Sequence, residues 1–116
     1  MKFKTLALEG RALTKVALAD SMFLRLRGLI GRDVEKLGGL WITPCGQIHM
    51  FFMSCPIDAV YLSRENTVLK VDAAVPTGVV CPPVKGARRV LELPSGAAEG
   101  FGIVPGTRLE LRDRLT

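Results

Sequence analysis

Short apolar or alternating runs, each closed by glycine, proline or a polar turn, follow one another along almost all of the 116 residues. Runs bounded in this way are typical of β-strands, because helices need longer segments of helical period. Many short strands create sheet edges that must be protected, and a small barrel protects them most economically. The sequence therefore predicts a mainly β fold of the β-rich α+β kind, a small closed or half-open β-barrel. A single open sheet in a mixed α+β fold is the alternative.

The expected strands alternate with clear turn signals. Gly10 after Glu9 supplies the positive φ that a tight turn between two strands in 3–19 needs. The segment 76–86, "PTGVVCPPVKG", is expected to be a loop or a sheet-edge excursion, since proline cannot donate to a strand ladder. Further strands are expected in "LWIT", "IHMFFM", "IDAVYLS", "VLKVDAAV", "RRVLELP" and the last segment, "RLELR".

One segment changes from strand period to helical period. In 20–31 the apolar residues recur at helical spacing, Asp20 or Ser21 can cap the start, and Gly31 is a natural end. The sequence predicts one short helix there, at about 20–31, and a helical turn or loop near 96–101. With no linker or internal repeat, residues 1–116 are expected to form a single domain.

Charge and cysteine content restrict the classes of partner and compartment. Sixteen Lys and Arg against eleven Asp and Glu give a net charge of +5, which favours anionic partners. The basic residues are scattered and are not interleaved with stacking aromatics, which argues against nucleic-acid binding. An odd count of three cysteines without a C-x-x-C motif favours reduced thiols in a cytoplasm. No signal peptide or apolar run of membrane-spanning length is visible, so a cytoplasmic chain without a membrane span is expected.

The stretch 47–63, "QIHMFFMSCPIDAVYLS", contains the only histidine and raises the question of a metal site. If "IHMFFM" is a strand, His49 and Met53 lie about 13 Å apart, at about 3.3 Å per residue, and cannot share one ion. On a helix the same two side chains would lie one turn apart and a soft-metal site would be feasible. The strand interpretation predicts no metal and no cofactor.

Asp58 follows in an apolar strand, where an unpaired charge is costly. It is expected either to accept backbone N–H groups, to pair with Arg88 or Arg89, or to act as a polar anchor in an apolar pocket. A hairpin with its turn at 54–57 would place Met53 opposite Asp58. If Leu91 and Leu93 point inward, strand alternation turns Glu92 outward, so Glu92 is expected to face solvent.

Three motifs in order along the chain carry a resemblance to a known family. They are "RLRGLIGRD", the block from "GLWI" through "IHMFFMSCPIDAVYLSRENTVLKV", and "ARRVLELPSGAAEGFGIVPG". The chain resembles the DUF192 family, also called UPF0127, of small bacterial and archaeal proteins, over about 12–111. The resemblance implies a compact β-rich, barrel-like fold and transfers no catalytic residue. Many members of that family are exported or lipid-anchored, whereas this chain shows no export signal. The residues of this chain that match the family pattern are Gly28, Leu29, Gly31, Arg32, His49, Phe51, Met53, Asp58, Glu92, Pro94, Gly96 and Gly106. The chain departs from the pattern at Ser63 and Thr107, where other hydrogen bonds must hold the turns.

The preferred functional hypothesis is a non-enzymatic β-barrel module that binds a small molecule or a peptide. Its candidate ligand-binding residues are His49, Met53, Asp58, Trp41 and Arg88. One alternative is an accessory domain that docks another protein through exposed Trp41, Phe101 or the proline-rich loop. The other alternative is a hydrolase or transferase with His49 or Asp58 as the base, which requires these two side chains in contact. The sequence does not specify the ligand or the oligomeric state.

Overall fold

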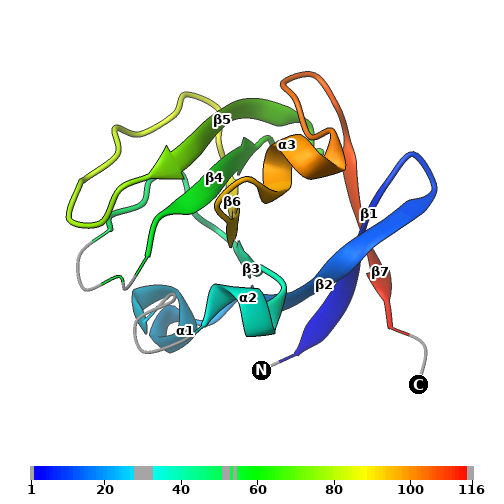
Figure 1. The fold of residues 1–116 in the computed structure, drawn as a ribbon, viewed down its shortest axis with the longest axis horizontal. Helices are drawn as coiled ribbons and strands as arrows, with labels where there is room; N and C mark the ends of the chain where they lie inside the picture. The colour runs from blue at the N-terminus through cyan, green and yellow to red at the C-terminus, as the bar shows by residue number, and fades with distance from the viewer. Residues whose placement is uncertain (1, 28–32, 51–52, 54, 115–116) are drawn as a thin grey trace.

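The computed structural model describes residues 2–27, 33–50, 53 and 55–114, and within these ranges seven strands form one sheet (Figure 1). The strand order is β5-β4-β6-β3-β2-β1-β7, in which only β2 and β3 run parallel. The strands are β1 (Phe3–Leu8), β2 (Arg11–Ala19), β3 (Leu40–Ile42), β4 (Ile57–Leu62), β5 (Val68–Val75), β6 (Arg89–Pro94) and β7 (Leu109–Asp113).

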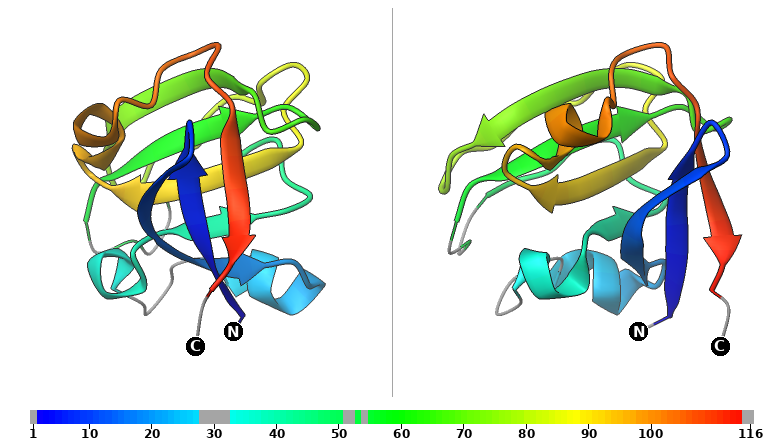
Figure 2. Two further views of the ribbon diagram at one scale, coloured as in Figure 1. Left: turned by 90° about the vertical axis from the view of Figure 1, so that its right-hand side faces the viewer. Right: turned by 45° about the vertical axis from the view of Figure 1, so that its right-hand side comes forward.

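The sheet curves strongly but does not close. Figure 2 shows β4, β5 and β6 running at a steep angle to β1 and β7. Among the described residues, the edge strands β5 and β7 come together beside an isolated bridge between Thr67 and Arg108. The Val68 N–H donates to the Thr107 carbonyl at 2.8 Å beside this bridge. The prediction of a β-rich, half-open barrel is confirmed, whereas the closed barrel is not formed.

Both faces of the central strands are buried. All six residues of β4 are buried, so its side chains alternate between two cores and not between a core and solvent. One core, inside the curve of the sheet, contains Leu6, Trp41, Val60, Leu91, Leu93 and Leu109. The other core, on the opposite face, contains Val34, Ile42, Met50, Ile57, Tyr61, Cys81 and Val90.

Three short helices cover parts of this sheet: α1 (Met22–Arg27), α2 (Val34–Leu37) and α3 (Ala97–Phe101). Ser21 caps α1 as predicted, since its Oγ accepts the Leu24 N–H at 3.2 Å. The expected end of this helix at Gly31 lies outside the described residues. The helical turn predicted near 96–101 is confirmed by α3. The helix α2 is not predicted; Asp33 caps it by accepting the Glu35 N–H at 3.0 Å. No helix in the described part of the chain is long and apolar enough to cross a membrane.

The predicted hairpin between 48–53 and 57–62 is wrong. His49 instead forms an isolated antiparallel bridge with Val80, within the proline-rich segment expected to be a loop or a sheet-edge excursion. The Met53 N–H donates to the Met50 carbonyl at 3.4 Å. The partner strand of 57–62 is β6 on one side and β5 on the other. The strand expected in "IHMFFM", and with it the separation expected for His49 and Met53, includes residues 51 and 52, which lie outside the described residues.

Candidate ligand-binding site

A depression of about 250 Å³ opens at the end of the sheet where β3 and β4 stop and β6 begins. Its position follows from strand register. Ile42 at the end of β3 pairs with Val90, and Leu62 at the end of β4 pairs with Arg89, so the residues that follow β3 and β4 meet the start of β6. The lining residues are Thr43, Pro44, Arg64, Arg88 and Arg89.

Backbone hydrogen bonds fix the three segments that meet at the depression. The Arg88 N–H donates to the Leu62 carbonyl at 2.8 Å, and the Cys45 N–H donates to the Arg88 carbonyl at 2.8 Å. The Arg89 guanidinium donates through Nη1 to the Arg64 carbonyl at 2.7 Å and to the Ser63 carbonyl at 3.3 Å. These contacts hold the turn that carries Arg64 against the start of β6, so the three arginines converge.

The depression is strongly cationic. Among the described residues that line it, three are arginines and none is acidic. Within the part of the chain that the structure describes, the ion pairs are Lys4–Asp113, Lys70–Asp72 and Arg112–Glu110, so none neutralises Arg64 or Arg88. Guanidinium groups remain charged at all physiological pH values and recognise carboxylate and phosphate oxygens in a bidentate way. The site is therefore built to attract an anion.

Of the predicted site residues, only Arg88 lines this depression. Trp41 is 2% exposed and belongs to the core inside the curve of the sheet, so of the three features that the docking alternative names, Trp41 is not exposed. Met53 packs against the opposite core, and His49 is exposed beside Val80. The structure thus distributes the five predicted residues over both cores and the surface and does not gather them in one pocket.

Asp58 is a structural carboxylate in this fold. It is 1% exposed, and its Oδ2 accepts the Gly96 and Ala98 N–H groups at 3.0 Å each. Its Oδ1 accepts the Ala74 N–H at 2.9 Å. Of the alternatives open from the sequence, the acceptance of backbone N–H groups is confirmed and the pairing with Arg88 or Arg89 is wrong.

Glu92, expected to face solvent, is 6% exposed in the middle of β6. The reason is that β6 lies between β3 and β4 and both of its faces are covered by core residues. Glu92 alternates with Leu91 and Leu93, so its side chain lies on the side of the core that contains Val90 and Tyr61. Burial raises the pKa of Glu92 to about 7. This residue is the buried acid that sequence reasoning missed, because a single strand pattern does not reveal that the second face is covered.

Two thiols and a phenol lie in or beside the core that contains Val90, and in the described residues they form no metal centre. Burial raises the pKa of Cys45, whose Sγ donates to the Gln47 carbonyl at 3.1 Å. Burial also raises the pKa of Tyr61, and the neighbouring Cys81 thiol and Asp72 carboxylate raise it further. Cys45, Cys55 and Cys81 are free thiols. The described residues contain no cluster of three or more His, Cys, Asp or Glu that could hold a metal ion.

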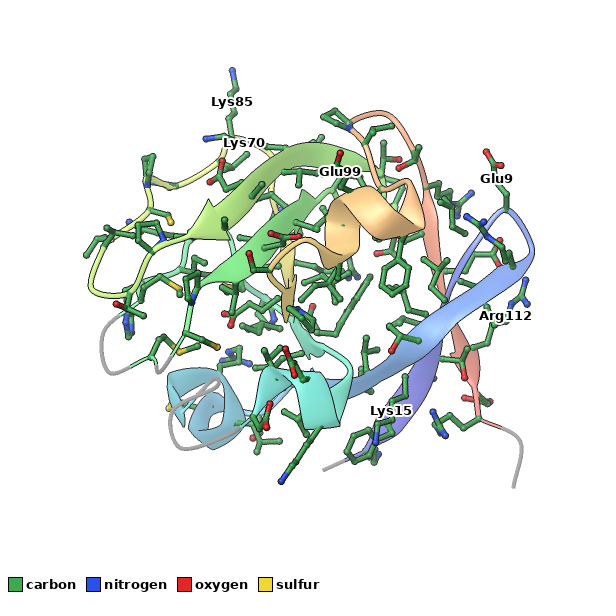
Figure 3. The ribbon with its side chains drawn as sticks, in the orientation of Figure 1. Glu9, Lys15, Lys70, Lys85, Glu99 and Arg112 are labelled. Atoms are coloured by element: carbon green, nitrogen blue, oxygen red, sulfur yellow. The ribbon has the colours of Figure 1, made fainter. Side chains whose placement is uncertain are left out.

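A second, larger depression of about 500 Å³ lies on the outer side of β1, β2 and β7. It is lined by Thr5, Ala12, Arg112, Asp113 and Arg114. Figure 3 shows Arg112 beside the β1–β2 hairpin. Its lining combines two arginines with the Asp113 carboxylate, and Arg112 already contacts the Glu110 carboxylate at 3.4 Å. An anion would meet partly neutralised charge here, which makes the first depression the better candidate.

The curved open sheet with an arginine-lined end defines a small β-rich domain of the half-open barrel class. The chain belongs to the DUF192 family, described as "Uncharacterized ACR, COG1430", whose model matches residues 4–111. The resemblance inferred from the sequence motifs is confirmed.

Relatives and solved structures agree with this membership. The UPF0127 protein of the archaeon Thermococcus sibiricus is 31% identical to this chain, over 88% of this chain and 70% of its own length. The UPF0127 protein of the archaeon Pyrococcus abyssi is also 31% identical, over 83% of this chain and 85% of its own length. A crystal structure of a Novosphingobium aromaticivorans protein of unknown function matches with a TM-score of 0.76, at 20% identity, over 93% of this chain and 83% of that one. A Sinorhizobium meliloti protein suggested to be a transcription regulator matches with a TM-score of 0.73, at 21% identity, over 95% and 94%. At these identities the solved structures show the fold alone.

Proposed function

We propose that this protein is a non-enzymatic module that binds a small anionic ligand in the depression lined by Thr43, Pro44, Arg64, Arg88 and Arg89. The observation that carries the proposal is the convergence of three arginines on one concavity without an acidic neighbour in its lining. Arginines that repel one another at close range are retained most readily where an anion offsets their charge. The net charge of +5 adds long-range attraction for the same class of ligand.

Two observations favour this binding role over the alternatives. Asp58, one of the two candidate bases, uses its carboxylate oxygens on three backbone N–H groups and is enclosed. The large exposed apolar side chains, such as Met22, Val80 and Val104, are distributed over α1, the proline-rich loop and the turn after α3, and Trp41 is buried. A concave polar site with positioned charges is the typical form of a small-ligand site.

The proposal is tested by thermal shift and isothermal titration calorimetry with sulfate, phosphate, citrate and the neutral compound glycerol. Anions are expected to stabilise the wild-type chain and glycerol to leave its melting temperature unchanged at equal concentration. Arg88→Gln and Arg64→Gln each remove one guanidinium from an exposed position. Each is expected to weaken anion affinity about tenfold, the effect of losing one charge-assisted contact.

Arg112→Gln is the matched control, because it removes the same charge from the second depression. It is expected to leave the affinity within about twofold, as only long-range attraction changes. Anion binding that is lost in Arg112→Gln and retained in Arg88→Gln would transfer the site to the second depression and refute the proposal. The absence of any anion-dependent stabilisation would refute it as well.

We further propose that the module works in the cytoplasm, where the thiols of Cys45, Cys55 and Cys81 stay reduced. Fractionation of the native cells, followed by detection with an antibody, tests this location. Recovery in an extracytoplasmic fraction would contradict it.

A further inference from the structure

We infer that the anion is a phosphate monoester of a small organic molecule, held through its phosphate group by Arg64, Arg88 and Arg89. This inference rests on the proposed anion-binding function and names its ligand class. It starts from the supply of donors. Each guanidinium presents five N–H donors in a planar fork, and Arg89 directs Nη1 to the Ser63 and Arg64 carbonyls.

Arginines supplied by two separate segments fit a tetrahedral anion better than a planar one. A carboxylate has two oxygens in one plane and is satisfied by one bidentate arginine. Here the arginines come from the turn after β4 and from the start of β6, and Thr43, after β3, also lines the depression. A phosphate monoester has three terminal oxygens that point in different directions, so it can accept from several guanidiniums at once.

Charge gives the same preference. A phosphate monoester carries a charge of about −1.5 to −2 at pH 7, whereas a carboxylate carries −1. Three arginines and no acid in the lining leave a surplus of positive charge that a monoanion would offset only in part. The more highly charged ligand therefore gains more in this depression.

The size and lining of the depression restrict the organic part. Its volume of about 250 Å³ lies below the ~300 Å³ at which pockets for drug-sized ligands begin. None of the described residues that line it is aromatic, so these residues offer a nucleobase no stacking surface. The depression thus suits a phosphate group attached to a short polar carbon chain and not a nucleotide recognised through its base.

Calorimetric titration with glycerol 3-phosphate, glycerate and methyl sulfate tests the ligand class. Glycerol 3-phosphate is expected to bind at least about tenfold more tightly than glycerate, because it offers a third oxygen and a second charge. Between pH 5.5 and 7.5 its affinity is expected to rise about fourfold, as the dianion forms with a pKa near 6. Methyl sulfate keeps its single charge over this range and therefore reports any titration of the protein itself.

The outcomes separate this inference from the proposed function. Equal affinities for glycerate and glycerol 3-phosphate, both weakened by Arg88→Gln, would refute the phosphate class and retain the anion site. A short single-stranded oligonucleotide that binds more tightly than glycerol 3-phosphate, and loses affinity in Arg88→Gln, would replace the small monoester by a nucleic-acid backbone. If none of these anions binds, the proposed function and the inference are both refuted.

Discussion

The carboxylate of Asp58, on β4, accepts hydrogen bonds from backbone N–H groups of β5 and of the start of α3, and so connects three parts of the chain. The first residue before α3 is Gly96, which has no side chain to cap the helix, and Asp58 accepts the Gly96 and Ala98 N–H groups in its place. The third donor is the N–H of Ala74, which has a φ of 50° where the β4–β5 register shifts. One buried acid thus holds a helix start and a bulge.

Asp58→Ala is expected to lower the free energy of unfolding by about 3 kcal/mol or more, because it leaves buried N–H donors without an acceptor. Urea denaturation followed by circular dichroism measures this change. Asp113→Ala is the matched control, since Asp113 makes an exposed ion pair with Lys4 at 3.0 Å. The control is expected to change stability by less than about 1 kcal/mol. Equal losses in the two variants would contradict the anchoring role of Asp58.

Glu92 is the residue whose ionisation opposes the fold. Its pKa is raised from 4.5 to about 7 by burial, so the folded chain keeps a proton that the unfolded chain releases. The stabilising contribution of this proton is fully present below about pH 4.5 and is lost as the pH rises to about 7. The shift corresponds to about 3 kcal/mol at most.

Glu92→Gln is expected to remove this pH dependence. The difference in unfolding free energy between variant and wild type should rise in favour of the variant from pH 4.5 to 7.5 and then remain constant. Chemical denaturation at a series of pH values measures it. Glu99→Gln, which changes an exposed glutamate on α3 (Figure 3), should show no such trend. A constant difference between Glu92→Gln and wild type over this range would exclude a buried titration at Glu92.

At the level of the elements, local pattern predicts strand positions well but not their partners. The turns at Glu9–Gly10 and the proline-rich segment 76–86 punctuate the chain as expected, because turn chemistry is encoded locally. The partner of His49 is Val80, about thirty residues away, and no local signal selects it over the nearby strand β4. The arginine depression was missed for the same reason, since only register brings Arg64 to Arg88.

The end of α2 offers a test of how closely two elements pack. Gly38 and Gly10 have nearly equal positive φ values of 82° and 80°. A Cβ on Gly38 would clash with the Lys15 carbonyl oxygen of β2, whereas a Cβ on Gly10 would meet nothing within 4 Å. The two positions thus share backbone strain and differ in space.

Gly10→Ala is expected to lower stability by about 1 kcal/mol, the cost of a left-handed conformation for alanine. Gly38→Ala is expected to cost at least about 2 kcal/mol more, because the backbone of β2 or α2 must move to relieve the contact. Thermal and urea denaturation of both variants measure the difference. Equal losses would mean that α2 does not approach β2 this closely in solution.

The whole molecule is an open sheet whose ends are joined at one corner. The strands β4, β6 and β3 each have neighbours on both sides, whereas β5 and β7 are edges that share only the contacts around Thr67 and Arg108. Composition and turn spacing predict such a curved β-rich sheet. They do not predict whether it closes, because closure depends on the few backbone contacts between residues 66–68 and 106–109.

Amide hydrogen exchange should therefore follow the order of the strands. The amides of β6 are expected to exchange only through global unfolding, because both neighbours of this strand must separate first. The amides of β5 that face away from β4 should exchange at least about a hundredfold faster, since opening this edge costs several kcal/mol less. The exception is Val68, whose N–H donates to the Thr107 carbonyl at 2.8 Å and is expected to be protected like the sheet interior.

Nuclear magnetic resonance at two protein concentrations measures the exchange rates of the β6 amides, the outward-facing β5 amides and the Val68 amide separately. Uniform protection along β5 at low concentration would show a closed barrel in solution, and protection that increases with concentration would show that a second molecule covers the edge.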